Sequence, residues 1–153
     1  MSDRVIQEAP PPRRLLRSTG AIAAGFLSVA VLSLATDQVL HMLDVYPPWD
    51  EPMRNIEDNL LALFYRSVYA VIGGYVTARL APAAPMRHVL VLGCIGTILS
   101  ALGAYAAISM DMGPAWYPIA LVLTALPLTL LGGYLGQGPR ATQQEHNTER
   151  QTG

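Results

Sequence analysis

The sequence has no lysine, a single cysteine and few charged residues. Only 14% of its 153 residues are charged, whereas soluble domains carry about 25%. The lone cysteine, Cys94, excludes an intramolecular disulfide and the redox chemistries that need paired cysteines. All ten basic residues are arginine and the net charge is −1, so the sequence gives no electrostatic indication of nucleic-acid binding.

The few charges gather at the two ends of the chain and in short connecting stretches, with long apolar runs between them. Hydrocarbon tolerates few uncompensated charges, and about 20 apolar residues in a helix cross a bilayer. We therefore predict an all-α membrane protein whose transmembrane domain, residues 18–136, is a four-helix bundle. The predicted spans cover about residues 18–43, 60–80, 88–109 and 117–136. The polar segments 1–17 and 137–153 are predicted to be disordered arms.

The distribution of arginine predicts the orientation in the membrane. Four arginines precede the first span, Arg79 and Arg87 flank the second loop, and two more lie in the C-terminal segment. The first and third loops together contain only Arg54. Because cytoplasmic loops are enriched in basic residues, this pattern predicts an up-down-up-down topology with both termini in the cytoplasm.

The first span is also compatible with a signal peptide. An arginine-rich start and an apolar run lead to Ser33-Leu34-Ala35, which resembles a small-residue cleavage site before Thr36. Cleavage there would leave three spans. The apolar run resumes after this site, through Leu43, which favours an uncleaved helix.

Small residues at four-residue spacing predict close packing between the helices, because helices in lipid associate largely through tight van der Waals contact. The triplet Gly-Gly-Tyr occurs twice, as residues 73–75 and 132–134, near the same end of the second and fourth spans. This recurrence suggests a parallel repeat of two helical hairpins. The predicted packing positions are Gly73, Gly74, Gly96, Ser100, Gly132 and Gly133. Pro127, in the middle of the fourth span, predicts a bend there.

Polar residues within the first two spans form the candidate site. Asp37 and His41 are four residues apart and share one helix face, and Arg66 lies at a similar depth in the second span. Tyr65 and Tyr69 can supply further hydrogen bonds. Two interpretations remain open: a buried Asp37–Arg66 ion pair that fixes the register of the two helices, or an outward-facing polar pocket for a ligand.

The sequence contains no nucleotide-binding glycine loop, nucleophile elbow or pair of catalytic carboxylates. Metal binding by Asp37 and His41 would need further ligands, and no spacing of acidic residues supplies them. We therefore predict neither catalytic residues, nor a cofactor, nor a bound metal.

Three stretches resemble a group of small bacterial inner-membrane proteins of no known activity. They are residues 36–41 with Pro47-Pro48-Trp49, residues 65–82 from Tyr65-Arg66 to Ala81-Pro82, and Trp116-Tyr117-Pro118. The resemblance covers about residues 18–136. It implies a multi-pass protein of the bacterial inner membrane and assigns no functional residues.

The leading functional hypothesis is a non-enzymatic accessory or oligomerising membrane component, because the polar segments are too short to fold as catalytic domains. Its predicted partners are the lipid bilayer and other copies of the chain or a larger membrane complex. The alternative is a small transporter or channel whose outward-facing pocket is lined by Asp37, His41 and Arg66. A membrane-embedded enzyme using His41 as a base is a third hypothesis.

Overall fold

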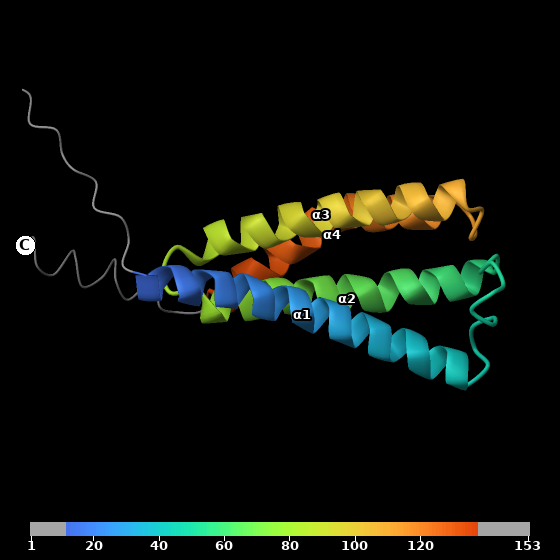
Figure 1. The fold of residues 1–153 in the computed structure, drawn as a ribbon, viewed down its shortest axis with the longest axis horizontal. Coiled ribbons are helices and arrows are strands. Elements are labelled where there is room, and N and C mark those ends of the chain that lie inside the picture. The colour runs from blue at the N-terminus through green and yellow to red at the C-terminus, as the bar shows by residue number, and fades with distance from the viewer. Residues whose placement is uncertain (1–11, 138–153) are drawn as a thin grey trace, which may run out of the picture.

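The computed structural model describes residues 12–137, and this part of the chain contains four α-helices and no β-strand (Figure 1). The helices are α1 (Pro12–Met42), α2 (Ile56–Leu80), α3 (Pro85–Ser109) and α4 (Trp116–Gly136). Each is long and apolar enough to cross a membrane. The all-helical prediction and the number of apolar helices are therefore confirmed for the described residues, whereas residues 1–11 and 138–153 of the predicted arms lie outside them.

All four helices begin earlier than the predicted spans, and the difference is largest for α1 and α2. α1 starts at Pro12 and not near residue 18, and α2 starts at Ile56 and not near residue 60. Hydropathy marks only the apolar part of a helix, whereas backbone hydrogen bonding continues into the polar interface. Proline suits the first turn of a helix, and the acidic side chains of Glu57 and Asp58 in the first turn of α2 favour the positive end of the helix dipole.

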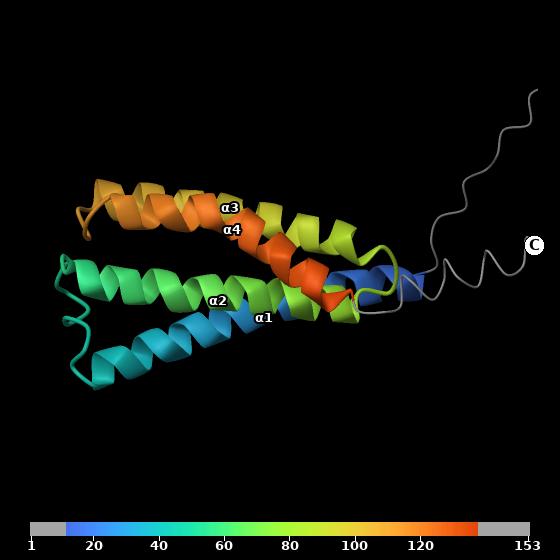
Figure 2. The same cartoon turned by 180° about the vertical axis from the view of Figure 1, so that it is seen from behind.

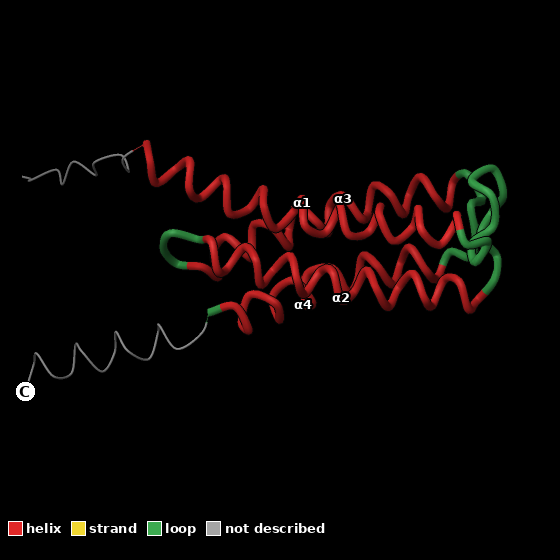
Figure 3. Tube along the Cα trace, turned by 90° about the horizontal axis from the view of Figure 1, so that it is seen from below, coloured by secondary structure: helices red, strands yellow, loops and turns green. Residues whose placement is uncertain are grey.

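The helices form two hairpins, α1–α2 and α3–α4. The loops at residues 43–55 and 110–115 lie at one end of the molecule, and the α2–α3 loop lies at the other (Figures 1 and 3). We call the first the acidic end, because its two loops contain four acidic residues and the single cation Arg54. The opposite, basic end includes Arg79 and Arg87. The two hairpins diverge towards the acidic end (Figure 1).

The direction of α4 changes near its middle, from a path beside α3 to one that crosses α2 (Figure 2). Pro127 lies inside this helix. Proline has no N–H and its ring crowds the preceding turn, so the bond to the carbonyl of Leu123 is lost and the helix bends. The bend brings the second half of α4 onto α2 and brings the two hairpins together at the basic end.

The first Gly-Gly-Tyr triplet lies where α2 meets two other helices. A Cβ added at Gly73 would overlap the side chain of Val29 on α1, and one added at Gly74 would overlap the carbonyl oxygen of Thr129 on α4. Gly73 therefore faces the other helix of its own hairpin, whereas Gly74 faces the other hairpin.

In the second triplet, the first glycine faces the other hairpin and the second glycine faces the other helix of its own hairpin. A Cβ at Gly132 would overlap the carbonyl oxygen of Val71 on α2, and one at Gly133 would lie 2.5 Å from a methyl group of Val89 on α3. A further glycine, Gly136, continues the close approach to α2 one turn later, beside Tyr75 and Ala78. The two triplets together form the crossing between the hairpins.

Two of the predicted packing positions lie on α3 beside a cavity. No atom lies within 4 Å of the position that a Cβ at Gly96 would occupy, and Ser100 and Gly96 line an open cavity. Four-residue spacing identifies a small-residue face but does not say whether a helix lies against it. Conversely, Gly25 is a packing position that was not predicted: its added Cβ would overlap the side chain of Thr77 and lie 2.7 Å from the carbonyl oxygen of Gly73. Its spacing of four from the buried Ala21 is the signal that could have identified it.

Both hairpin turns begin in the same way. Asp44 lies two residues after the end of α1 and has φ 56°, and Asp111 lies two residues after the end of α3 and has φ 50°. Aspartate adopts this left-handed conformation more readily than most residues, so it suits the position where a helix stops. The match adds a second common feature to the two hairpins, beside the glycine triplets.

We expect Gly132→Ala to destabilise the protein, because the new methyl group would overlap backbone atoms of α2 that cannot move independently. Overpacking of this kind costs about 1–3 kcal/mol. Gly96→Ala is the matched control, since its methyl group enters open space. Thermal unfolding of the detergent-solubilised protein measures both. Equal melting temperatures for the two variants would contradict the proposed close crossing.

Candidate functional site at the Arg66–Asp37 ion pair

The centre of the candidate site is an ion pair between α1 and α2. Arg66 Nη2 lies 2.5 Å from Asp37 Oδ2. The Asp37 side chain is 10% exposed and that of Arg66 is 35% exposed. The structure thus brings together the two residues that the sequence analysis placed at similar depth, and each compensates the charge of the other within an apolar helical bundle.

Tyrosine hydroxyl groups extend the ion pair towards the acidic end. The hydroxyl of Tyr65 donates to Asp37 Oδ1, so both carboxylate oxygens have a donor. Tyr46, in the loop after α1, lies with its hydroxyl 3.4 Å from that of Tyr65 and 3.3 Å from the carbonyl oxygen of Asp58. Burial raises the pKa of Tyr46 above its ordinary value of 10.0, so the hydroxyl stays protonated and can donate.

The other two candidate residues lie beside this network. His41 Nδ1 donates to the backbone carbonyl oxygen of Asp37 at 2.8 Å, and its ring stacks on Trp49 with 3.8 Å between the ring centroids. Tyr69 Oη lies 2.8 Å from Thr36 Oγ1, which forms a second link between α1 and α2. His41 therefore lies at the rim of the site. The contact between Tyr69 and Thr36 stabilises the packing of α1 against α2 beside it.

A cavity of about 240 Å³, the end cavity, opens beside the ion pair at the acidic end. Asp37, His41 and Arg66 all line it, together with the loop aromatics Tyr46 and Trp49 and the α4 residue Tyr117. The lining combines an ion pair with aromatic and proline side chains. It can therefore hold a small ligand that makes both polar and apolar contacts.

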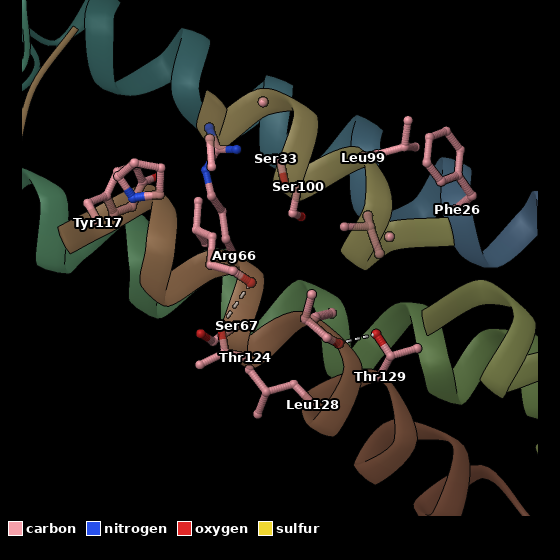
Figure 4. A pocket seen from close by; sticks show the side chains of 18 of the residues that line it. Phe26, Ser33, Arg66, Ser67, Leu99, Ser100, Tyr117, Thr124, Leu128 and Thr129 are labelled. Carbon is pink, nitrogen blue, oxygen red and sulfur yellow. Dashed lines mark hydrogen bonds between the residues drawn. The ribbon is translucent and has the colours of Figure 1, made fainter. Parts of the chain in front are cut away.

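A second cavity of about 490 Å³, the central cavity, lies between the two hairpins on the other side of Arg66 (Figure 4). Most of its lining is apolar and comes from all four helices, including Phe26, Leu99 and Leu128. The hydroxyl groups of Ser67 and Ser100 are among its few polar groups. The divergence of the hairpins creates this space, and their crossing near the glycine triplets closes it towards the basic end.

Arg66 lines both cavities, as does Tyr117. Figure 4 shows Tyr117 beside the side chain of Arg66. Among the hydrogen bonds found in residues 12–137, the guanidinium donates only to Asp37. Its buried Nε has no acceptor among the described residues. An arginine has five N–H donors, so the described residues leave most of its hydrogen-bonding capacity unused.

Tyr117 is a site residue that was not among the candidates predicted from the sequence, where it appears only in the stretch Trp116-Tyr117-Pro118. Its distance from Arg66 in the sequence is large, and only the packing of α4 against α2 brings the two together. No local pattern in the sequence could have identified this contact. Tyr46 was missed for a similar reason, because its 5% exposure depends on how the loop folds back over Tyr65.

The two loops of the acidic end contact each other directly. Met53 N–H donates to the carbonyl oxygen of Met112 at 3.0 Å, and Arg54 Nη2 lies 2.7 Å from Asp111 Oδ2. The buried Asn59 donates from Nδ2 to the carbonyl oxygens of Met53 and Asn55, which holds the first loop in place. These contacts join the hairpins at the end where the helices diverge.

The site has no arrangement for metal binding within residues 12–137, where no group of three or more His, Cys, Asp or Glu side chains could hold an ion. His41 donates to a backbone carbonyl and does not contact the Asp37 carboxylate in the hydrogen bonds that the structure describes. The arrangement therefore provides binding groups: an arginine with unused donors, a hydroxyl network and two cavities.

Four long apolar helices around a compensated ion pair define the chain as a multi-pass integral membrane protein. Comparison with protein families, with curated protein sequences and with solved structures finds no match.

We expect Asp37→Asn to destabilise the protein by about 3 kcal/mol, because it leaves the Arg66 guanidinium without a counter-ion at a mostly buried position. The matched control is Arg54→Gln, which breaks the exposed Arg54–Asp111 pair and should cost less than about 1 kcal/mol. Unfolding in detergent with increasing denaturant measures both. Equal losses of stability would show that the Arg66–Asp37 pair does not hold α1 and α2 together.

Proposed function

We propose that this protein is a non-enzymatic component of a bacterial inner membrane that binds a ligand at Arg66. In this proposal the four helices cross the membrane in an up-down-up-down arrangement, with the acidic end outside and both termini in the cytoplasm. Ligands reach Arg66 through the cavities that it lines.

The orientation is supported by the charges at the two ends. Arg79 and Arg87 belong to the basic end, where they match the enrichment of basic residues in cytoplasmic loops. The acidic end has Trp49 and Trp116 at the level where tryptophan prefers a membrane interface. The three loops alternate between the acidic and the basic end, which is compatible with four passes through the membrane (Figure 1).

The single observation that carries the binding proposal is the position of Arg66 between two cavities. A purely structural ion pair between two helices needs no cavity beside it. Here 35% of the arginine side chain is exposed, and cavities of about 240 and 490 Å³ adjoin it. Intramembrane ionisable residues are costly, and those that face a cavity commonly mark a ligand pathway.

The orientation can be tested by cysteine labelling in a Cys94→Ser background. Glu51→Cys at the acidic end should react with a membrane-impermeant maleimide on intact cells, because we place that loop outside. Ala83→Cys, in the exposed loop between α2 and α3, should react only after the cells are opened. Labelling of Ala83→Cys on intact cells, with Glu51→Cys protected, would reverse the proposed topology.

The binding proposal predicts that the wild-type chain purified from native membranes carries a bound small molecule that mass spectrometry detects. The variant Asp37→Asn/Arg66→Gln removes the guanidinium without leaving an unpaired charge. It should retain about tenfold less of that molecule, the loss expected from about 1.4 kcal/mol of binding free energy.

Arg54→Gln is the control, because it removes an arginine from the same end of the molecule but outside both cavities. Equal amounts of bound molecule in the wild type and the double variant, or no bound molecule in either, would contradict ligand binding at Arg66. The second outcome would favour a purely accessory role.

A further inference from the structure

We propose that the central cavity holds a neutral lipid with one apolar chain and a carbonyl-bearing head group, with the carbonyl oxygen accepting a hydrogen bond from Arg66. This inference rests on the proposed ligand binding at Arg66 and specifies the chemical class of the ligand. Three features of the cavity support it: its position, its lining and its charge.

The cavity lies at the depth of the hydrocarbon. Arg66 is about 15 Å along the helix axis from the first residue of α2, at 1.5 Å per residue. From there the cavity continues along the bundle as far as Thr129, close to the crossing of α2 and α4. A ligand that fills it must therefore place most of its length beside apolar walls, with one polar group at Arg66.

The lining fits an acyl chain. Phe26, Val29, Leu92, Leu99, Leu121 and Leu128 provide apolar walls from three of the helices. The volume of about 490 Å³ lies within the range of ligand pockets, about 300–1,000 Å³. Two of the hydroxyl groups that α4 contributes to the lining, those of Thr124 and Thr129, already donate to carbonyl oxygens of their own helix. These two hydroxyl groups therefore do not need an acceptor from the ligand.

Lipid can reach the cavity between α1 and α3. These helices approach each other where Gly25 lies beside Leu92, and they diverge from there towards the acidic end (Figure 1). Phe26 of α1 and Leu99 of α3 lie side by side at the cavity and are 39% and 46% exposed (Figure 4). Both side chains are apolar, so a lipid chain passing between them would lose no hydrogen bond.

The charge of the site selects the head group. Asp37 already neutralises Arg66, and both of its carboxylate oxygens have donors. An anionic head group would give this cluster a net negative charge in a medium of low dielectric constant, which is unfavourable. A cationic head group would be repelled by the guanidinium. A carbonyl oxygen, as in an ester, accepts a hydrogen bond from a free N–H of Arg66 and adds no charge.

The test measures binding of tritiated 1-oleoylglycerol and tritiated oleate, at a pH where oleate is ionised, to the purified full chain in a non-ionic detergent. The two probes share the same chain and differ in the charge of the head group. We expect the wild type to bind 1-oleoylglycerol at least about tenfold more tightly than oleate, a difference of about 1.4 kcal/mol. In Asp37→Asn the preference should reverse, because the guanidinium then lacks its counter-ion.

A second pair of variants keeps the test independent of the stability of Asp37→Asn. Gly96→Phe places a ring in the open space of the central cavity and should abolish binding of 1-oleoylglycerol. Ile95→Phe adds the same ring to a neighbouring position that is 39% exposed and does not line the cavity, so binding should be unchanged.

Tighter binding of oleate than of 1-oleoylglycerol by the wild type would overturn the neutral head group. Equal binding in the Gly96→Phe and Ile95→Phe variants would overturn the central cavity as the site. If neither probe binds while the purified chain still carries a molecule that depends on Arg66, this inference fails and the proposed function stands. If no such molecule is found either, both fail.

Discussion

The close crossing of α2 and α4 is the contact on which the rest of the structure depends. It needs Gly74 on α2, and Gly132 and Gly136 at successive turns of α4, because backbone atoms occupy the space where side chains would lie. Pro127 directs α4 into this crossing, so the two hairpins meet at the basic end and separate towards the acidic end (Figure 2). The central cavity and the exposure of Arg66 to it follow from this geometry.

Much of this architecture could be predicted from the sequence, because it depends on local properties. Segregated charges and apolar runs give the four helices, and the positions of Asp37 and Arg66 in the first two helices give their proximity. The glycine triplets were recognisable as packing positions, whereas Gly96 has the same spacing and faces open space. Tyr117 and Tyr46 could not be predicted as site residues, because their contacts arise from tertiary packing and a folded loop.

The site combines a structural and a binding role in one residue. Arg66 holds α1 to α2 through Asp37, and its remaining donors lie between two cavities of different polarity. The end cavity has aromatic and charged walls, and the central cavity is mostly apolar. A molecule bound across Arg66 would therefore have distinct polar and apolar parts, which connects the proposed ligand class to the shape of the protein.

The divergence of the hairpins also affects the surrounding bilayer. A bundle that is narrow at one end and broad at the other occupies more area in one leaflet than in the opposite leaflet. Lipids around such a tapered body pack with less strain where the membrane is convex on the side of the broad end. In the proposed orientation, the glycine contacts that bring α2 and α4 together would place the more widely separated ends of the hairpins in the outer leaflet.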